Sequence, residues 1–110
     1  MYTDFYSEEI TKKLEKLKRK DPSQYDAARK KMDQVLANPN HIYKWLHHVK
    51  LRRAEFHIFE TDERMLSVSN HTLKGFQRVH TGHFVLVFKI DHNKKAVFFC
   101  DYDHHDKIYR

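Results

Sequence analysis

Basic, imidazole and phenol side chains gather in the last third of this chain, around two apolar runs. They are Lys74, Arg78, His80, His104, His105 and Tyr109. Cleavage of RNA without a metal starts when a ribose 2′-hydroxyl attacks the adjacent phosphate. The reaction needs a base for that hydroxyl, cations for the charge of the phosphorane, and an acid for the leaving oxygen. The six side chains include all of these groups, so the sequence indicates phosphodiester chemistry if the fold brings them together.

The individual residues suit different parts of that reaction. Arg78 has a planar guanidinium that can contact a phosphate through two hydrogen bonds. His80 lies two residues further along, and imidazole titrates near neutral pH, so it could act as a base or as a charged stabiliser. If the tail is helical, His105 and Tyr109 share one face, because positions i and i+4 coincide there. Lys74 could contact phosphate or could simply be a lysine in a turn.

Each candidate also has a plainer explanation. Arg78 and His80 could be surface residues that alternate with buried ones along a strand, and residues at a chain terminus often remain solvated. We favour a role in the chemistry for Tyr109 and for one of the two histidines, His104 or His105, which the sequence does not distinguish.

A divalent metal site at the same tail is a weaker alternative. Carboxylate and imidazole donors of the kinds that Zn²⁺ and Mn²⁺ bind stand at Asp101, Asp103, His104 and His105. No separated set of ligands in the sequence, such as a His-Glu-x-x-His motif, supports this site. We therefore predict no metal and no cofactor.

Two amphipathic helices are expected after a short aromatic strand at residues 2–6. Ser7 is a suitable N-cap for the first helix, and two glutamates follow it where the helix dipole favours negative charge. Asp21 and Pro22 suit the start of the second helix, which should end before Pro39. Because the two helices are so close in sequence, they should form an antiparallel hairpin.

The first helix carries a strongly basic outer face, because its lysines and arginine fall mostly outside the apolar stripe. Those that we consider for RNA contact are Lys12, Lys13, Lys16 and Arg19. Such a face could simply keep the protein soluble, or it could bind RNA phosphates in a salt-dependent way that ignores sequence. Arg52 and Arg53, from the middle of the chain, are further candidates for RNA contact.

The segment that follows the helices is the hardest to assign. Residues 55–60 and 65–69 could form two strands or a short helix, because the turn between them lacks an Asn-Gly or Asp-Gly pair. We favour the hairpin. Trp45, with Tyr43 and Leu46, is expected to cap the helix hairpin rather than to stack on a base.

Three antiparallel strands are expected in the last third of the chain. Alternation over residues 76–80 places Arg78 and His80 on one face of the first strand. Residues 84–90 are nearly all apolar, as in a central strand that is covered on both faces. Residues 96–100 would then return antiparallel. A strand, two helices and a meander packed on the helices make an α+β fold.

The composition fits a single domain that spans residues 1–110. The formal charge of +6, with ten neutral histidines, favours a polyanionic partner, although a solvated basic surface would carry the same charge. Cys100 is the only cysteine and sits in an apolar run, so it should be buried. One cysteine and the lack of a hydrophobic leader indicate a reducing, cytoplasmic location. No apolar run is long enough to cross a membrane, so no membrane partner is expected.

The order of these elements and motifs resembles the RelE/ParE-like toxins of type II toxin–antitoxin modules. The resemblance covers about residues 2–40 and 73–110, and includes the Leu-Lys-Gly sequence that opens at Leu73. It also includes a His-x-x-x-x-Tyr ending, here from His104 to Tyr109. The family resemblance implies the same α+β order: a short strand, an antiparallel helix hairpin, and an antiparallel meander packed on the helices.

The resemblance also implies roles for single residues. Arg78 stands where the family carries a basic residue, and His80 where relatives usually have lysine or arginine. Tyr109 matches a terminal tyrosine that contacts the scissile region. The chain departs from the pattern at Val85, where many relatives have arginine. His80, His83 or an arginine of the middle segment could compensate for that loss.

The function that the resemblance implies is that of a toxin that cuts mRNA in the ribosomal A site without a metal. Its partners would be mRNA, ribosomal RNA and a cognate antitoxin protein that holds it inactive. ParE-like relatives, which share the fold but inhibit DNA gyrase without cutting RNA, are one alternative. The other is a degenerate binding module, in which an insertion at about residues 49–71 covers the site. The histidines and tyrosine of the tail favour cleavage, because gyrase inhibition needs no acid–base pair.

Overall fold

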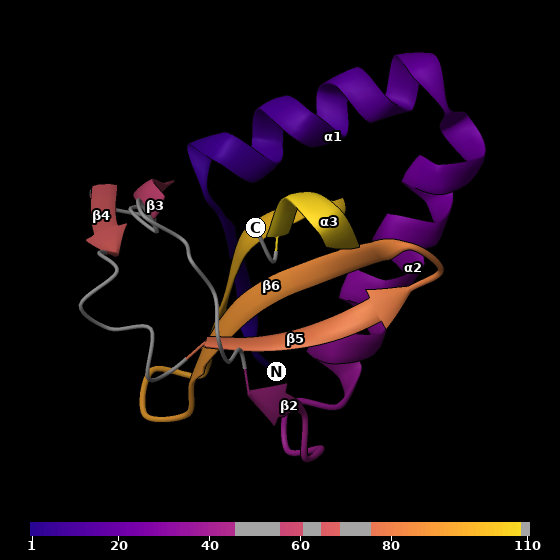
Figure 1. Cartoon of the computed structure of the whole chain (residues 1–110). Coiled ribbons are helices and arrows are strands. Elements are labelled where there is room, and N and C mark those ends of the chain that lie inside the picture. Colours follow the sequence, from indigo (N-terminus) through magenta and orange to yellow (C-terminus); the bar gives the residue numbers. More distant parts are fainter. Residues whose placement is uncertain (46–55, 61–64, 69–75, 109–110) are drawn as a thin grey trace.

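A mixed five-stranded sheet that packs against two helices forms the body of the protein (Figure 1). The computed structural model describes residues 1–45, 56–60, 65–68 and 76–108. The strands of the sheet are β1 (Thr3–Tyr6), β2 (Lys44–Trp45), β5 (Phe76–Thr81), β6 (Phe84–Asp91) and β7 (Ala96–His104). The helices are α1 (Glu8–Lys20), α2 (Pro22–Ala37) and the short α3 (His105–Ile108). The predicted α+β fold, with strand, helix hairpin and meander in that order, is confirmed.

The first strand lies beside the last one. The strand order is β1-β7-β6-β5-β2, antiparallel throughout except that β1 runs parallel to β7. Thr3 pairs with Ala96, and Tyr6 pairs with Phe99. Since β1 ends at this point and leads directly into α1, the helix continues along the second half of β7. The sequence did not indicate this parallel pairing.

The helix boundaries follow from their capping residues, as the sequence predicted. The Ser7 hydroxyl accepts a hydrogen bond from the Ile10 N–H at 3.1 Å, and Asp21 accepts one from the Gln24 N–H at 3.2 Å. Pro22 occupies the first turn of α2. None of the described helices is long and apolar enough to span a membrane.

The core lies between the helix hairpin and one face of the sheet. Apolar side chains of the two helices meet those of the central strands there, as expected from the helical and strand periodicities. The buried members are Ile10, Leu14, Ala28, Met32, Val35, Leu86, Phe88, Val97, Phe99 and Tyr102. In β6, the run from Val85 to Phe88 is fully buried, which confirms a central strand covered on both faces.

The last strand is longer than the predicted segment 96–100. β7 continues to His104, so that histidine lies in the strand and only His105 begins the helical tail. The polar residues after Cys100 hid this extension, because their alternation with buried Tyr102 is a weak strand signal. The β6–β7 register also shifts between Val87 and Phe88, a β-bulge at buried Cys100 that the sequence did not indicate.

The middle of the chain contains the hairpin that we favoured over a helix. β3 (Phe56–Glu60) and β4 (Met65–Val68) pair antiparallel as a separate two-stranded sheet, and β3 lies beside β1 and α1. The expected insertion at about residues 49–71 stays a prediction. Trp45 differs from expectation, since it belongs to edge strand β2 and is half exposed.

Ser7 provides a test of how β1 and α1 are joined to β7. Its hydroxyl is fully buried and also donates a 2.6 Å hydrogen bond to the Cys100 carbonyl. Ser7→Ala removes the cap and leaves that carbonyl unpaired, so we expect a loss of about 2 kcal/mol in the free energy of unfolding. Urea denaturation would measure it. Ser23→Ala, at an exposed serine of α2, is the control and should change stability by less than about 0.5 kcal/mol. Equal effects would contradict the role of Ser7.

Candidate functional site

The pairing of β5, β6 and β7 places the predicted basic residues at one end of the sheet. In the register, His80 lies opposite Val85, which in turn lies opposite Asp103. Arg78 occupies the next same-face position along β5. The predicted alternation is therefore confirmed, since Val79 packs on the opposite side against the helix core.

Arg78, His80 and His105 come together although His105 belongs to a different element. The Arg78 Nη1 atom lies 3.3 Å from the His80 Nδ1 atom. The His80 and His105 rings stack with their centroids 5.6 Å apart. The His105 N–H donates a 2.7 Å hydrogen bond to the His83 carbonyl, which fixes the start of α3 against the β5–β6 turn. This turn passes through Gly82 at a positive φ of 64°, which favours glycine.

Lys44 belongs to the same group, and the sequence analysis missed it. It pairs directly with Arg78 across β2 and β5. Burial lowers the pKa of His80, and the guanidinium of Arg78 lowers it further. The charges of His105 and Lys44 act in the same direction. A two-residue edge strand has no periodicity to detect, so only the pairing with β5 reveals this lysine. We call Lys44, Arg78, His80 and His105 the His80 cluster.

His104 takes a different position from His105. Its ring packs on Phe84 with the centroids 4.3 Å apart, beside the stack of Phe84 on Tyr102. The two histidines nevertheless line one small polar cavity of about 220 Å³. The other described residues that line it are His83 and Asp106. Of the remaining predicted site residues, four lie outside the described residues: Arg52, Arg53, Lys74 and Tyr109.

The position at which the family resemblance implies an arginine is occupied here by a fully buried valine. Val85 lies between His80 and Asp103 in the register, so an arginine there would neighbour the His80 cluster. Arg78 and Lys44 already place two cations beside His80. Arg78 and Lys44 are thus the described cations best placed to compensate for the missing arginine.

Lys13 differs from the other lysines of α1. Its ammonium lies 2.7 Å from a carboxylate oxygen of Asp101 and 2.9 Å from one of Asp103. Burial lowers the pKa of Lys13, but the two carboxylates outweigh this effect and raise it. Lys13 thus joins α1 to β7 instead of belonging to the outward basic face that we predicted. We refer to these three residues as the Lys13 clamp.

The clamp also bears on the metal alternative. In the described part of the chain, no group of three or more His, Cys, Asp or Glu side chains is arranged to hold a metal ion. Asp101 and Asp103 instead share one ammonium. On α1, Lys12 pairs with Glu8 at 3.0 Å at the surface, while Lys16 and Arg19 are exposed to solvent.

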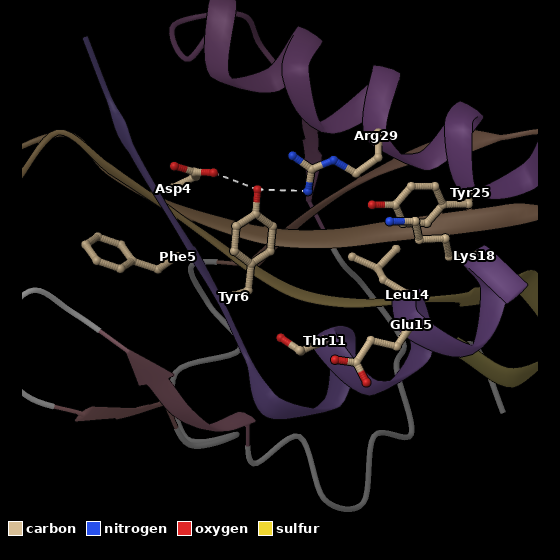
Figure 2. Close-up of a pocket in the computed structure, with 9 residues that line it drawn as sticks. All are labelled: Asp4, Phe5, Tyr6, Thr11, Leu14, Glu15, Lys18, Tyr25 and Arg29. Carbon is tan, nitrogen blue, oxygen red and sulfur yellow. Dashed lines mark hydrogen bonds between the residues drawn. The ribbon is translucent and has the colours of Figure 1, made fainter. Parts of the chain in front are cut away.

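A larger cavity, of about 430 Å³, lies between β1, α1 and α2 (Figure 2). Figure 2 shows the Tyr6 hydroxyl between Asp4, to which it donates at 2.6 Å, and Arg29, which donates to it at 3.2 Å. Burial and the Asp4 carboxylate raise the pKa of Tyr6 to about 12, so the phenol is protonated at neutral pH. Among the residues that the structure describes, none of the predicted site residues lines this cavity. Because its central polar groups bind one another, it is a poorer candidate for phosphodiester chemistry than the His80 cluster.

Comparisons with known proteins show relatives of similar length. A protein of Methanocaldococcus jannaschii named "Putative toxin RelE4" is 37% identical over 102 residues, which are 92% of this chain and 83% of that protein. An uncharacterized protein of Methanosarcina mazei is also 37% identical over 102 residues, which are 92% of this chain and 91% of that protein. No family model matches the chain. No solved structure matches it either.

The Lys13 clamp predicts a pH-dependent stability. The pKa of Asp103 is lowered: burial raises it, but the hydrogen bonds from Lys13 and the His104 N–H lower it more. A lowered carboxyl pKa stabilises the fold above its unfolded value of about 3.9, and this contribution is lost as the pH falls through the folded value. Lys13→Met should thus cost about 2 kcal/mol in the free energy of unfolding at pH 7 and less at pH 3.

Urea denaturation at the two pH values would measure this difference. Lys12→Met is a matched control on the same helix, because Lys12 forms an exposed ion pair with Glu8 and should affect stability little at either pH. A cost for Lys13→Met that does not change between pH 7 and pH 3 would contradict the clamp.

The His80 cluster predicts how His80 titrates. Its NMR titration midpoint should lie below about 6.5, the usual value for imidazole. Lys44→Gln removes one of the charges that lower this pKa, so the midpoint should rise. Lys30→Gln removes the same charge from an exposed position on α2 and should leave the midpoint unchanged. A midpoint that does not respond to Lys44→Gln would place Lys44 outside the cluster.

Proposed function

This chain belongs to the RelE-like toxins of toxin–antitoxin systems, and we propose that it is a metal-independent endoribonuclease that cuts ribosome-associated mRNA. The observation that best supports the proposal is the His80 cluster, in which two imidazoles and two cations from β2, β5 and α3 meet. The His105 ring stacks on His80, which itself contacts Arg78. Such a set of groups matches the needs of 2′-hydroxyl attack on a phosphate.

In the proposed reaction, His80 is the base. Because its pKa is lowered, its imidazole is neutral at pH 7 and can accept the proton of the 2′-hydroxyl. The 2′-oxygen then bonds to phosphorus, and the bond from phosphorus to the 5′-oxygen breaks. His105, in its protonated form, gives a proton to that leaving oxygen. The products are a 2′,3′-cyclic phosphate and a 5′-hydroxyl end.

Arg78 and Lys44 hold the scissile phosphate in this proposal. A guanidinium can donate two parallel hydrogen bonds to phosphate oxygens, and the neighbouring ammonium adds a second positive charge. Both are most effective when negative charge develops on the phosphorane. Tyr109, which lies outside the described residues, would orient the substrate as the family resemblance implies.

Contacts away from the cluster would be electrostatic. The exposed Lys16 and Arg19 of α1 are proposed to bind phosphates of ribosomal RNA, together with Lys12. Lys74, Arg52 and Arg53 are the other proposed RNA contacts. We also propose a cognate antitoxin protein as a partner that holds the toxin inactive, and a single domain over residues 1–110.

The proposal predicts specific cleavage of mRNA in a reconstituted translation system. Primer extension should reveal new 5′ ends when the protein is added. Protein that has been treated with EDTA and then freed of the chelator should cut equally well, because the proposed reaction uses no metal bound to the protein. Arg78→Ala and His80→Gln should each reduce the cleavage rate by about 100-fold or more, because each removes a group that acts in the transition state. His92→Gln, at an exposed turn at the other end of β6, should leave the rate unchanged.

The same assay distinguishes the alternatives. Intact mRNA together with blocked supercoiling by DNA gyrase would overturn the proposal in favour of a ParE-like activity. Intact mRNA with normal gyrase would favour a degenerate binding module. Wild-type cleavage by both His80→Gln and Arg78→Ala would show that the His80 cluster is not the site.

A further inference from the structure

A small polar cavity adjoins the His80 cluster at the end of the sheet. Its described lining residues are His83 of the β5–β6 turn, His104 at the end of β7, and His105 and Asp106 of α3. We call it the imidazole pocket. His105 belongs to both sites, because its ring stacks on His80 and also lines the pocket. A ligand that reaches across His105 would therefore contact both at once.

The lining favours an anion over a cation. The side chains of the three histidines are exposed, and their ring N–H groups can donate hydrogen bonds to an anion. Asp106 is the one carboxylate of the described lining, and its side chain is 98% exposed. One of its carboxylate oxygens lies 3.7 Å from the Nδ1 atom of His105, which is beyond hydrogen-bonding distance. The described residues also lack any grouping of ligands suited to a metal ion.

The pocket is fixed by the backbone rather than by its histidine side chains. The His105 N–H bonds to the His83 carbonyl, and the pairing of Phe84 with His104 holds the end of β7 against β6. The ring of His104 is supported by Phe84. Replacement of the His83 imidazole should thus leave the fold unchanged, because the turn uses only the main chain of this residue.

We propose that the imidazole pocket binds a second phosphate of the RNA, next to the scissile phosphate that the His80 cluster holds. This inference rests on the proposed function and adds a binding subsite to it. His83 and His104 donate charge-assisted hydrogen bonds to the phosphate oxygens, and His105 lies between the two phosphates. A protonated imidazole carries the positive charge that a phosphate prefers, so RNA binding by this subsite should be stronger at acidic than at alkaline pH.

The other charged groups around the imidazole pocket do not reverse this pH dependence of RNA binding. On β5, His80 and Arg78 are neutral or positive. On β7, Asp103 is held by Lys13 of α1. On α3, Lys107 adds a positive charge and Asp106 a negative one. Asp106 is therefore the single nearby carboxylate of the described residues that opposes an anion in the pocket.

Uncleavable dinucleotides provide the test. The parent dinucleotide carries a single internal phosphate, and its first sugar lacks the 2′-hydroxyl, so it is not cleaved. Two derivatives carry one more phosphate, at the 3′ end in one and at the 5′ end in the other. One of the two derivatives should bind about tenfold more tightly than the parent at pH 6, but less than about twofold more tightly at pH 8. His83→Gln should abolish the gain at pH 6. Asp106→Asn should enlarge it, whereas a cation site would be weakened by the same change. His92→Gln should match the wild type.

The inference is overturned if neither added phosphate tightens binding at pH 6, or if the gain persists unchanged in His83→Gln. NMR gives a second readout without RNA: inorganic phosphate at pH 6 should shift the imidazole signals of His83 and His104 but not that of His92. Unshifted His83 and His104 signals would also overturn it.

The two proposals fail in different ways. If the added phosphate tightens dinucleotide binding but mRNA stays intact in the translation system, the pocket is supported and the nuclease is rejected. Cleaved mRNA with no gain from the second phosphate would support the nuclease and reject the pocket.

Discussion

β7 is the element on which the rest of the structure depends, because it is held along both of its edges. β6 pairs with it over its full length. On the other edge, β1 pairs with its first half, and α1 then continues through two side-chain contacts, the Ser7 hydroxyl bond to Cys100 and the Lys13 clamp. Because both of its edges are held, the strand extends in a fixed direction to His104, and α3, which follows it directly, lies at the end of β5. The position of His105 beside His80 follows from that extension.

The Lys13 clamp also shapes the electrostatics of the candidate site. Asp101 and Asp103 lie in register with Arg78 and His80, separated from them only by β6. Two unpaired carboxylates there would attract the guanidinium and repel a phosphate. Lys13 pairs with both carboxylates from the helix side. Burial lowers the pKa of His80, and the charges of Arg78, His105 and Lys44 lower it further. Lys13 belongs to a helix whose other lysines are mostly solvated, yet it pairs with the two carboxylates that lie in register with the His80 cluster.

Much of the fold could be predicted from local patterns. The caps at Ser7 and Asp21, the helix hairpin and the apolar strand β6 all follow from signals within a few residues of sequence, whereas local signals favoured the β3–β4 hairpin over a helix without deciding it. The parallel pairing of β1, the two-residue strand β2 and the bulge at Cys100 could not be predicted in this way. Each depends on a partner strand that is far away in the chain, and such long-range pairing produces no periodic pattern in the sequence.

For the candidate site, the sequence alone determined which chemical groups are present: guanidinium and imidazole on one face of β5, and more imidazoles at the end of the last strand. The tertiary structure alone decided which of them meet. It separated His104 from His105, added Lys44 to the His80 cluster, and assigned Lys13 to two carboxylates of β7. The physical reason is that residue type and local alternation set what a side chain can do and which face it occupies, whereas its partners depend on the register of strands and helices that only the folded chain brings together.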